Sequence, residues 1–238
     1  MRQWLGSIAF TVYLFASTAI FGLVVLASAP FPHRVTYRLC LYWADSVLFL
    51  LRILCRLDHV VEGFGNLPEQ NTVLLVKHSS AWEAIAQLKL FPTQTWVMKR
   101  ELLLVPILGW ILWLLRPIAI DRSAGRKAVR KVITEGQQRL ADGLWIVIFP
   151  EGTRVPPGES RPYGLSGALL ARAAGRPIVP VAHNAGEFWP RRGWLKRPGT
   201  IRVVVGPAIP TAGREPREVN AQVRAWIEAR LAEMSSDI

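Results

Sequence analysis

The N-terminal stretch at residues 4–29 limits the possible folds most strongly, because it contains no charged side chain. A helix needs about 20 predominantly apolar residues to cross a bilayer, so this stretch is long enough to be a membrane anchor. Arg2 and the small residues Ala27-Ser28-Ala29 would also fit a signal peptide with its cleavage site. The apolar run is longer than the roughly 7–15 residues of a typical signal core, so the sequence favours a retained anchor.

A second hydrophobic helix is predicted for residues 34–56. When each residue is advanced by about 100° around a helix, the charged residues fall within one narrow stripe. They are Arg34, Arg38, Asp45, Arg52 and Arg56. The remaining surface is apolar, which suits a helix in the headgroup layer or one that returns into the membrane. The alternative is a core helix with one hydrated edge. We expect a two-helix membrane anchor at residues 1–57 and an α/β domain at 58–238.

The chain is both apolar and basic, with 51% hydrophobic residues and a formal net charge of +12. Such a charge attracts nucleic acid, anionic lipid headgroups or phosphorylated substrates. The sequence contains no recognisable nucleic-acid-binding motif. Together, the apolar and basic composition favours a lipid surface as partner and argues against nucleic acid.

Metal and disulfide chemistry find little support in the sequence. Cys40 and Cys55 both fall in the second predicted helix, too far apart along it for a bridge. No cluster of cysteine and histidine residues has the spacing of a metal site. We therefore predict no disulfide and no metal.

After residue 57, short apolar runs alternate with helical segments. Residues 58–68 are predicted to form a short strand and a Gly/Pro turn, and further strands are predicted at residues 72–76, 95–98, 117–120, 144–149, 178–182 and 201–205. Helices are predicted at residues 80–90, 101–115, 124–141, 167–174 and 216–234, and residues 185–200 are expected to form a long loop. This alternation predicts an α/β fold with a mostly parallel sheet flanked by helices. The apolar helix at 101–115 could enter the membrane, line an apolar groove or pack on the sheet.

His78 follows the first of these buried strands, where ligands of open parallel sheets collect. Histidine takes up and returns protons near neutral pH, since its ordinary pKa is about 6.5. A carboxylate on one ring nitrogen would hold the tautomer and stabilise the imidazolium. Glu83 can supply it if His78 lies in the turn before the helix and Glu83 in the second helical turn. We predict His78 as general base and Glu83 as its partner.

Three further strands run into cationic residues. Lys99 follows the strand at 95–98, Arg122 follows 117–120, and the block FPEGTR at 149–154 follows 144–149. In this block, glycine permits close backbone approach, Thr153 adds a hydroxyl, and Arg154 offers a planar fork for phosphate oxygens. If the strands are parallel, these cations and His78 meet at one rim. A base beside several cations suits a substrate with a reactive hydroxyl and a phosphate.

The order of these motifs resembles that of the glycerolipid acyltransferase family, most closely its bacterial 1-acyl-glycerol-3-phosphate acyltransferases. The resemblance covers about residues 60–210 and includes Val179-Pro180-Val181. It implies an α/β acyltransferase fold with His78 as base and Glu83 as its acidic partner. It further implies that the phosphate is bound by Lys99, Arg122, Glu151, Gly152, Thr153 and Arg154. The family usually has aspartate where this chain has Glu83, whose arm is one methylene longer.

The resemblance also implies a reaction and a location. A fatty acyl group would pass from acyl-CoA or acyl carrier protein to the sn-2 hydroxyl of lysophosphatidic acid, giving phosphatidic acid without a cofactor. The expected location is the cytoplasmic face of the bacterial inner membrane, in contact with the lipid bilayer. Alternative acceptors are another lysophospholipid, glycerol 3-phosphate or a lyso-aminolipid. Alternative functions are a non-catalytic protein that binds anionic lipid, or a secreted hydrolase if the chain is cleaved at Ala29.

Overall fold

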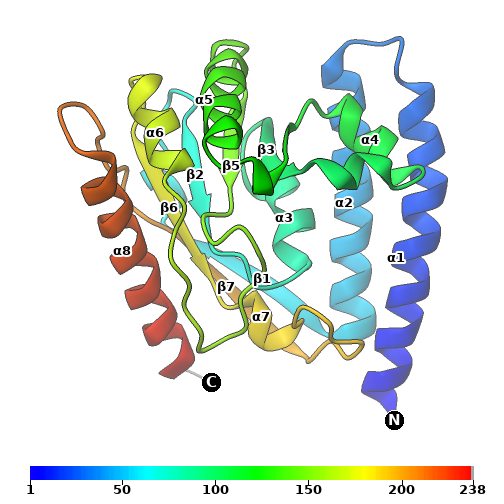
Figure 1. The fold of residues 1–238 in the computed structure, drawn as a ribbon. Coiled ribbons are helices and arrows are strands. Elements are labelled where there is room, and N and C mark those ends of the chain that lie inside the picture. Colours follow the sequence, from blue (N-terminus) through cyan, green and yellow to red (C-terminus); the bar gives the residue numbers. More distant parts are fainter. Residues whose placement is uncertain (237–238) are drawn as a thin grey trace.

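Seven strands form one sheet within residues 1–236, the part of the chain that the computed structural model describes (Figure 1). Their order across the sheet is β1-β7-β6-β2-β5-β3-β4. All neighbouring strands are parallel except β6 and β7, so the predicted mostly parallel α/β sheet is confirmed. The strands are β1 (Leu57–Glu62), β2 (Val73–Val76), β3 (Gln94–Lys99), β4 (Ile118–Ile120), β5 (Trp145–Ile148), β6 (Ile178–His183) and β7 (Gly199–Val205).

Helices cover both faces of the sheet (Figure 1). Alternate residues of the central strands enter separate cores; for example, Leu75 packs with the helices on one face and Leu74 with those on the other. Both faces are therefore covered, which explains why these strands read as continuous apolar runs. One face carries α5 (Arg126–Ala141), α6 (Ser166–Ala173) and α8 (Pro216–Ser236). The other carries α1 (Arg2–Ala27), α2 (His33–Cys55) and α3 (Trp82–Leu90).

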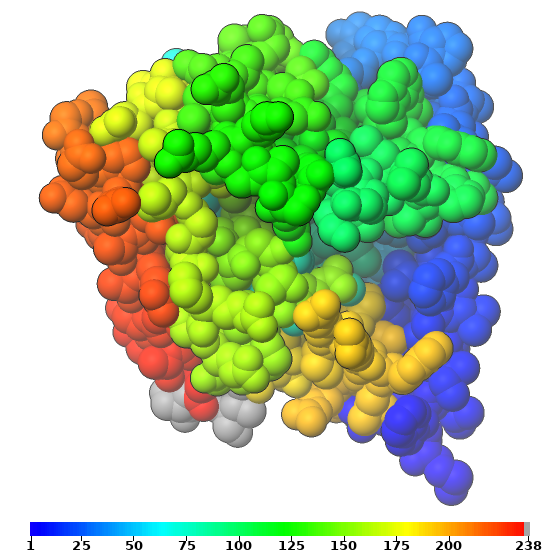
Figure 2. Space-filling view, in the orientation of Figure 1, coloured from blue at the N-terminus to red at the C-terminus, as the bar shows by residue number. Residues whose placement is uncertain are grey.

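The first two helices form an antiparallel pair along one side of the molecule (Figures 1 and 2). Their backbones approach closely at Gly6, where an added Cβ atom would lie 2.1 Å from the carbonyl oxygen of Leu54. Phe10 of α1 and Leu51 of α2 are buried in the same core as strand residues such as Val203. The helix pair therefore shares the core on this face of the sheet: α2 contacts β1 and α3, and α1 contacts α2 and α4.

Both predicted N-terminal helices are present, but only one of them is a candidate for crossing a membrane. Within residues 1–236, α1 is the one helix that is long and apolar enough to cross a membrane. Charged side chains interrupt α2, and Arg56 lies just beyond its end with a left-handed φ of 55°. A broad face of α2 is buried, including Tyr37, Ala44 and Val47. One face of this helix therefore packs in the core, as in the alternative interpretation, while Tyr42, Phe49 and Ile53 remain exposed.

Two predictions of local structure also need correction. The apolar helix expected at 101–115 is divided into a 3-10 helix, η2 (Arg100–Leu104), and α4 (Leu108–Leu114). Pro106 lies at the break because proline lacks an N–H donor and its ring clashes with the preceding helical turn. The loop expected at 185–200 begins with the short helix α7 (Ala185–Phe188) and ends where β7 starts. The remaining 3-10 helices are η1 (Phe64–Asn66) and η3 (Arg122–Ala124).

Candidate active site

The order of the strands brings four of the predicted site residues to one cavity. His78 follows β2, Arg154 follows β5, Lys99 ends β3 and Arg122 follows β4. These four strands are consecutive neighbours and run in the same direction. All four side chains line a cavity of about 330 Å³. The convergence expected from parallel strands is therefore present.

Most of the remaining cavity wall is apolar. It is built by side chains from α1, α2, α3, β3, η2 and α4, so parts of the chain far apart in sequence enclose one space. They include Phe21, Trp43, Ile85, Leu88, Trp96 and Met98. The face drawn in Figure 2 has a recess between the green segment near residues 100–125 and the gold segment near 185–198. Few polar groups converging in an apolar cavity are typical of a ligand site.

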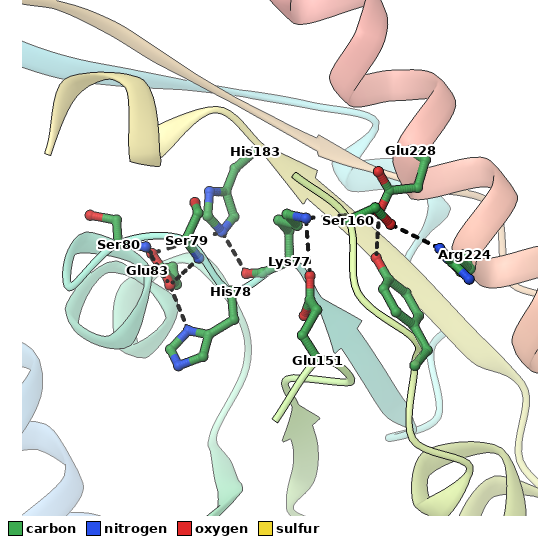
Figure 3. Close-up of polar contacts among 11 residues, drawn as sticks. Lys77, His78, Ser79, Ser80, Glu83, Glu151, Ser160, His183, Arg224 and Glu228 are labelled. Carbon is green, nitrogen blue, oxygen red and sulfur yellow. Dashed lines mark hydrogen bonds and ion pairs between the residues drawn. The ribbon is translucent and has the colours of Figure 1, made fainter. Parts of the chain in front are cut away.

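His78 and Glu83 form a hydrogen-bonded pair beside this cavity (Figure 3). The distance from His78 Nδ1 to Glu83 Oε1 is 2.7 Å. A carboxylate can only accept, so Nδ1 is the donor, and in the neutral imidazole Nε2 is then the unprotonated nitrogen that a general base requires. Glu83 lies in the first turn of α3 instead of the second, and its longer arm still reaches the imidazole.

The carboxylate of Glu83 is also held by backbone amides at the start of α3. Ser79 N–H donates to Oε1 at 3.0 Å, and Ser80 N–H donates to Oε2 at 2.9 Å. Burial alone would raise the pKa of Glu83, but the hydrogen bonds from His78 and from the Ser80 amide lower it. The group therefore remains ionised near neutral pH and can stabilise a positive charge on His78.

The FPEGTR block and the residue after it, Val155, also contact His78. The ring of Phe149 stacks on the imidazole with 4.1 Å between centroids and 20° between planes. The backbone N–H of Val155 donates to the His78 carbonyl oxygen at 2.8 Å. The orientation of His78 is thus held through its ring face, its Nδ1 atom and its backbone.

Glu151 is absent from the residues that line the cavity and lies in a buried ion pair. Its buried carboxylate is 3.2 Å from Lys77 Nζ, which is also 3.8 Å from Glu228 (Figure 3). Burial raises the pKa of Glu151, while the positive charge of Lys77 opposes that shift. Lys77 directly precedes His78, and Glu151 lies three residues before Arg154. The ion pair therefore joins the two loops that carry these residues.

Gly152 and Thr153 are also absent from the residues that line the cavity. Gly152 has φ of 67° and forms a turn in which its N–H donates to the Phe149 carbonyl oxygen at 3.0 Å. This left-handed conformation favours glycine, which is a structural reason for its place in the block. Of the six residues predicted to bind phosphate, the cavity therefore includes Lys99, Arg122 and Arg154.

Sequence reasoning did not select Lys77 or His183 for the site. Both are buried, and both lie at the ends of neighbouring strands, Lys77 after β2 and His183 at the end of β6. The signal for Lys77 was present, because a lysine directly after a buried apolar strand needs a counter-charge. No comparable local signal distinguished His183.

Comparison with known proteins gives independent information on the chain. A protein-family model described as Acyltransferase matches residues 59–184. The 1-acyl-sn-glycerol-3-phosphate acyltransferase of Pseudomonas aeruginosa is 41% identical over 238 residues. That alignment covers 98% of this chain and 93% of the relative.

More distant similarities agree with this match. The human 1-acyl-sn-glycerol-3-phosphate acyltransferase alpha is 30% identical over 175 residues, covering 71% of this chain and 62% of the human protein. The crystal structure of the 1-acyl-sn-glycerophosphate (LPA) acyltransferase PlsC from Thermotoga maritima aligns with a TM-score of 0.82 and 21% identity. It covers 98% of this chain and 96% of its own, so the two proteins share a fold over nearly their whole lengths.

Proposed function

The chain belongs to the acyltransferase family and is an O-acyltransferase, and we propose that it acylates the sn-2 hydroxyl of 1-acyl-glycerol 3-phosphate. The acyl group comes from a thioester and the product is phosphatidic acid. The observation that carries this proposal is the shared cavity that joins His78 to Lys99, Arg122 and Arg154 within apolar walls. A base, a set of phosphate-binding cations and a space for aliphatic chains match the chemistry of that acceptor. The name of the Pseudomonas relative supports the same assignment.

In the proposed complex, the acceptor phosphate is held by Arg122 and Arg154 with Lys99 nearby. Arginine presents donors in a planar fork that matches phosphate oxygens. Within the described part of the chain, Arg154 Nε is buried and has no hydrogen-bond partner, so it is available to a ligand. Binding the phosphate at these cations would bring the sn-2 hydroxyl close to His78, and such positioning lowers the barrier to reaction.

The proposed chemistry is direct transfer. His78 Nε2 accepts the proton of the sn-2 hydroxyl while its oxygen attacks the thioester carbonyl carbon. Glu83 stabilises the imidazolium through Nδ1–H. When the tetrahedral intermediate collapses, the carbon–sulfur bond breaks and the imidazolium returns the proton to the leaving thiolate. The acyl group ends on the sn-2 oxygen, and no acyl-enzyme or cofactor takes part.

We further propose that the enzyme works at the cytoplasmic face of the bacterial inner membrane, where it receives acyl groups from acyl-CoA or acyl carrier protein. Many large apolar side chains are exposed on α1, on α2 and around α4. They include Trp4, Leu5, Ile8, Val12, Phe15, Ile20, Leu23, Val24, Tyr42, Phe49, Ile53, Leu104, Leu108, Trp110 and Trp113. Contact with lipid would cover them, and the net charge of +12 would favour an anionic leaflet. The same helices line the cavity, so lipid substrates could reach it from the bilayer.

The proposal is tested by thiol release from acyl-CoA, and in parallel from acyl carrier protein, with purified protein in detergent micelles. Acceptors are lysophosphatidic acid, other lysophospholipids, glycerol 3-phosphate and a lyso-aminolipid. We expect turnover with lysophosphatidic acid and a loss of about 10²–10⁴-fold in His78→Ala, the usual contribution of a general base. His33→Ala is the matched control, because His33 does not line the cavity. Thiol release by a folded His78→Ala protein at the native rate would refute the base assignment.

A further inference from the structure

His183 is a buried histidine that the proposed reaction does not use. It ends β6, and its side chain is 1% exposed. β6 pairs with β2, the strand that leads to His78. His183 therefore lies beside the turn that carries Lys77 and His78, here called the catalytic loop (Figure 3). Its ring also packs edge-on against Trp82, the first residue of α3, with 6.0 Å between ring centroids.

The hydrogen bonds of His183 determine its protonation. Nδ1 accepts from the backbone N–H of Ala185 at 3.3 Å, so this nitrogen carries no proton. Nε2 therefore carries the proton, and it donates to the carbonyl oxygen of Lys77 at 2.8 Å. Burial lowers the pKa of His183 although Glu83 opposes the shift, in agreement with a neutral ring. His183 is thus a fixed dipole whose N–H end points towards the catalytic loop.

The same N–H end faces the carboxylate of Glu83. His183 Nε2 lies 3.9 Å from Glu83 Oε2, on the side of the carboxylate away from His78. Glu83 Oε1 receives His78 Nδ1 and two amides, whereas Oε2 receives Ser80 N–H alone among the hydrogen bonds of the described residues. His183 therefore borders the less strongly held oxygen and limits rotation of the carboxylate in that direction.

We propose that His183 is a positioning residue for the His78–Glu83 pair. It acts in two ways: it holds the backbone carbonyl of Lys77, immediately before His78, and it confines the carboxylate of Glu83. Because Glu83 has the longer arm, its carboxylate has more freedom than that of an aspartate and gains more from such confinement. This inference rests on the proposed function, since it concerns the alignment of the proposed base.

The test compares native enzyme, His183→Ala and His183→Gln in the thiol-release assay. Loss of one positioning hydrogen bond should lower kcat of His183→Ala on the order of tenfold, with KM for both substrates changed less than about twofold. His183→Gln should recover most of kcat, because its amide can donate to the Lys77 carbonyl. Val132→Ala, in the core on the opposite face of the sheet, controls for a general loss of stability and should keep the native kcat.

Coupling to Glu83 is tested by adding His183→Ala to Glu83→Asp. The carboxylate of the shorter aspartate lies further from residue 183. The fold-loss in kcat of the double variant should therefore be smaller than the product of the two single fold-losses. Losses that multiply, a native kcat in His183→Ala, an effect on KM alone, or no recovery in His183→Gln would each overturn the proposal. Absence of turnover in the native enzyme would instead refute the proposed function, so the two failures are distinguishable.

Discussion

Replacing Glu151 with glutamine should destabilise the fold and leave acceptor binding largely intact. The substitution keeps the shape of the side chain but removes the charge that faces Lys77, whose side chain is 3% exposed. Breaking one side of a buried ion pair typically costs about 3–5 kcal/mol, because the remaining charge is buried without compensation. Lys77 keeps Glu228 at 3.8 Å, and that carboxylate is partly exposed, so the lower end of the range is expected.

A loss of about 3 kcal/mol corresponds to a fall in melting temperature of about 6–12 °C for a chain of this size. The assay is thermal unfolding of purified protein in detergent, followed by the fluorescence of its 10 tryptophans. Steady-state kinetics are measured well below both melting temperatures. Glu159→Gln, at an exposed position of the following loop, is the matched control and should change stability by less than about 0.5 kcal/mol.

A double variant separates charge from packing. Lys77→Met combined with Glu151→Leu removes both charges and should recover most of the stability lost in Glu151→Gln. If Glu151→Gln instead keeps the native melting temperature and raises the acceptor KM tenfold, Glu151 binds the phosphate and the structural reasoning is wrong.

The other predictions concern the base, the phosphate site and acid stability. Glu83→Gln should lower kcat by about 10²–10⁴-fold with little change in KM, because the amide stabilises the His78 imidazolium poorly. A fall in kcat matched by an equal rise in KM would contradict this. Arg154→Ala should raise KM for the phosphorylated acceptor more than for the thioester, measured with each substrate varied in turn; an unchanged acceptor KM would remove Arg154 from the phosphate site. The lowered pKa values of His183 and Glu83 mean that both groups bind protons more weakly in the folded protein than in the unfolded chain. Their contribution to stability should therefore decrease as pH falls below about 6.5 for His183 and below about 4.5 for Glu83. The raised pKa of Glu151 acts in the opposite direction. Melting temperatures recorded across this range should fall less steeply in His183→Gln and Glu83→Gln, and an unchanged slope in both would refute the assignment.

Local patterns in the sequence were sufficient to predict most of the strands and helices. Continuous apolar runs such as residues 144–149 identified the buried central strands, because strands covered on both faces leave no position for polar side chains. Placing His78, Lys99, Arg122 and Arg154 at the ends of successive strands was sufficient to predict their convergence, given parallel strands. That inference needed no side-chain geometry, since parallel strands deliver their carboxyl ends to one edge of a sheet.

Local patterns failed where packing between distant elements decided the outcome. The apolar surface of α2 suited a membrane as well as a protein core, and contacts with α1, α3 and β1 decided which of its faces is buried. The family resemblance implied that Glu151 binds the phosphate, whereas the structure pairs its carboxylate with the buried Lys77, more than 70 positions earlier.

The sequence alone determined the order of strands and helices and the types of chemistry available at the strand ends. Only the tertiary structure decided which charges face the cavity, which charges neutralise one another, and that His183 lies behind Glu83. The physical reason is that hydrophobic periodicity is a property of neighbouring residues, while burial of a charged or titratable side chain depends on the partner that folding brings to it.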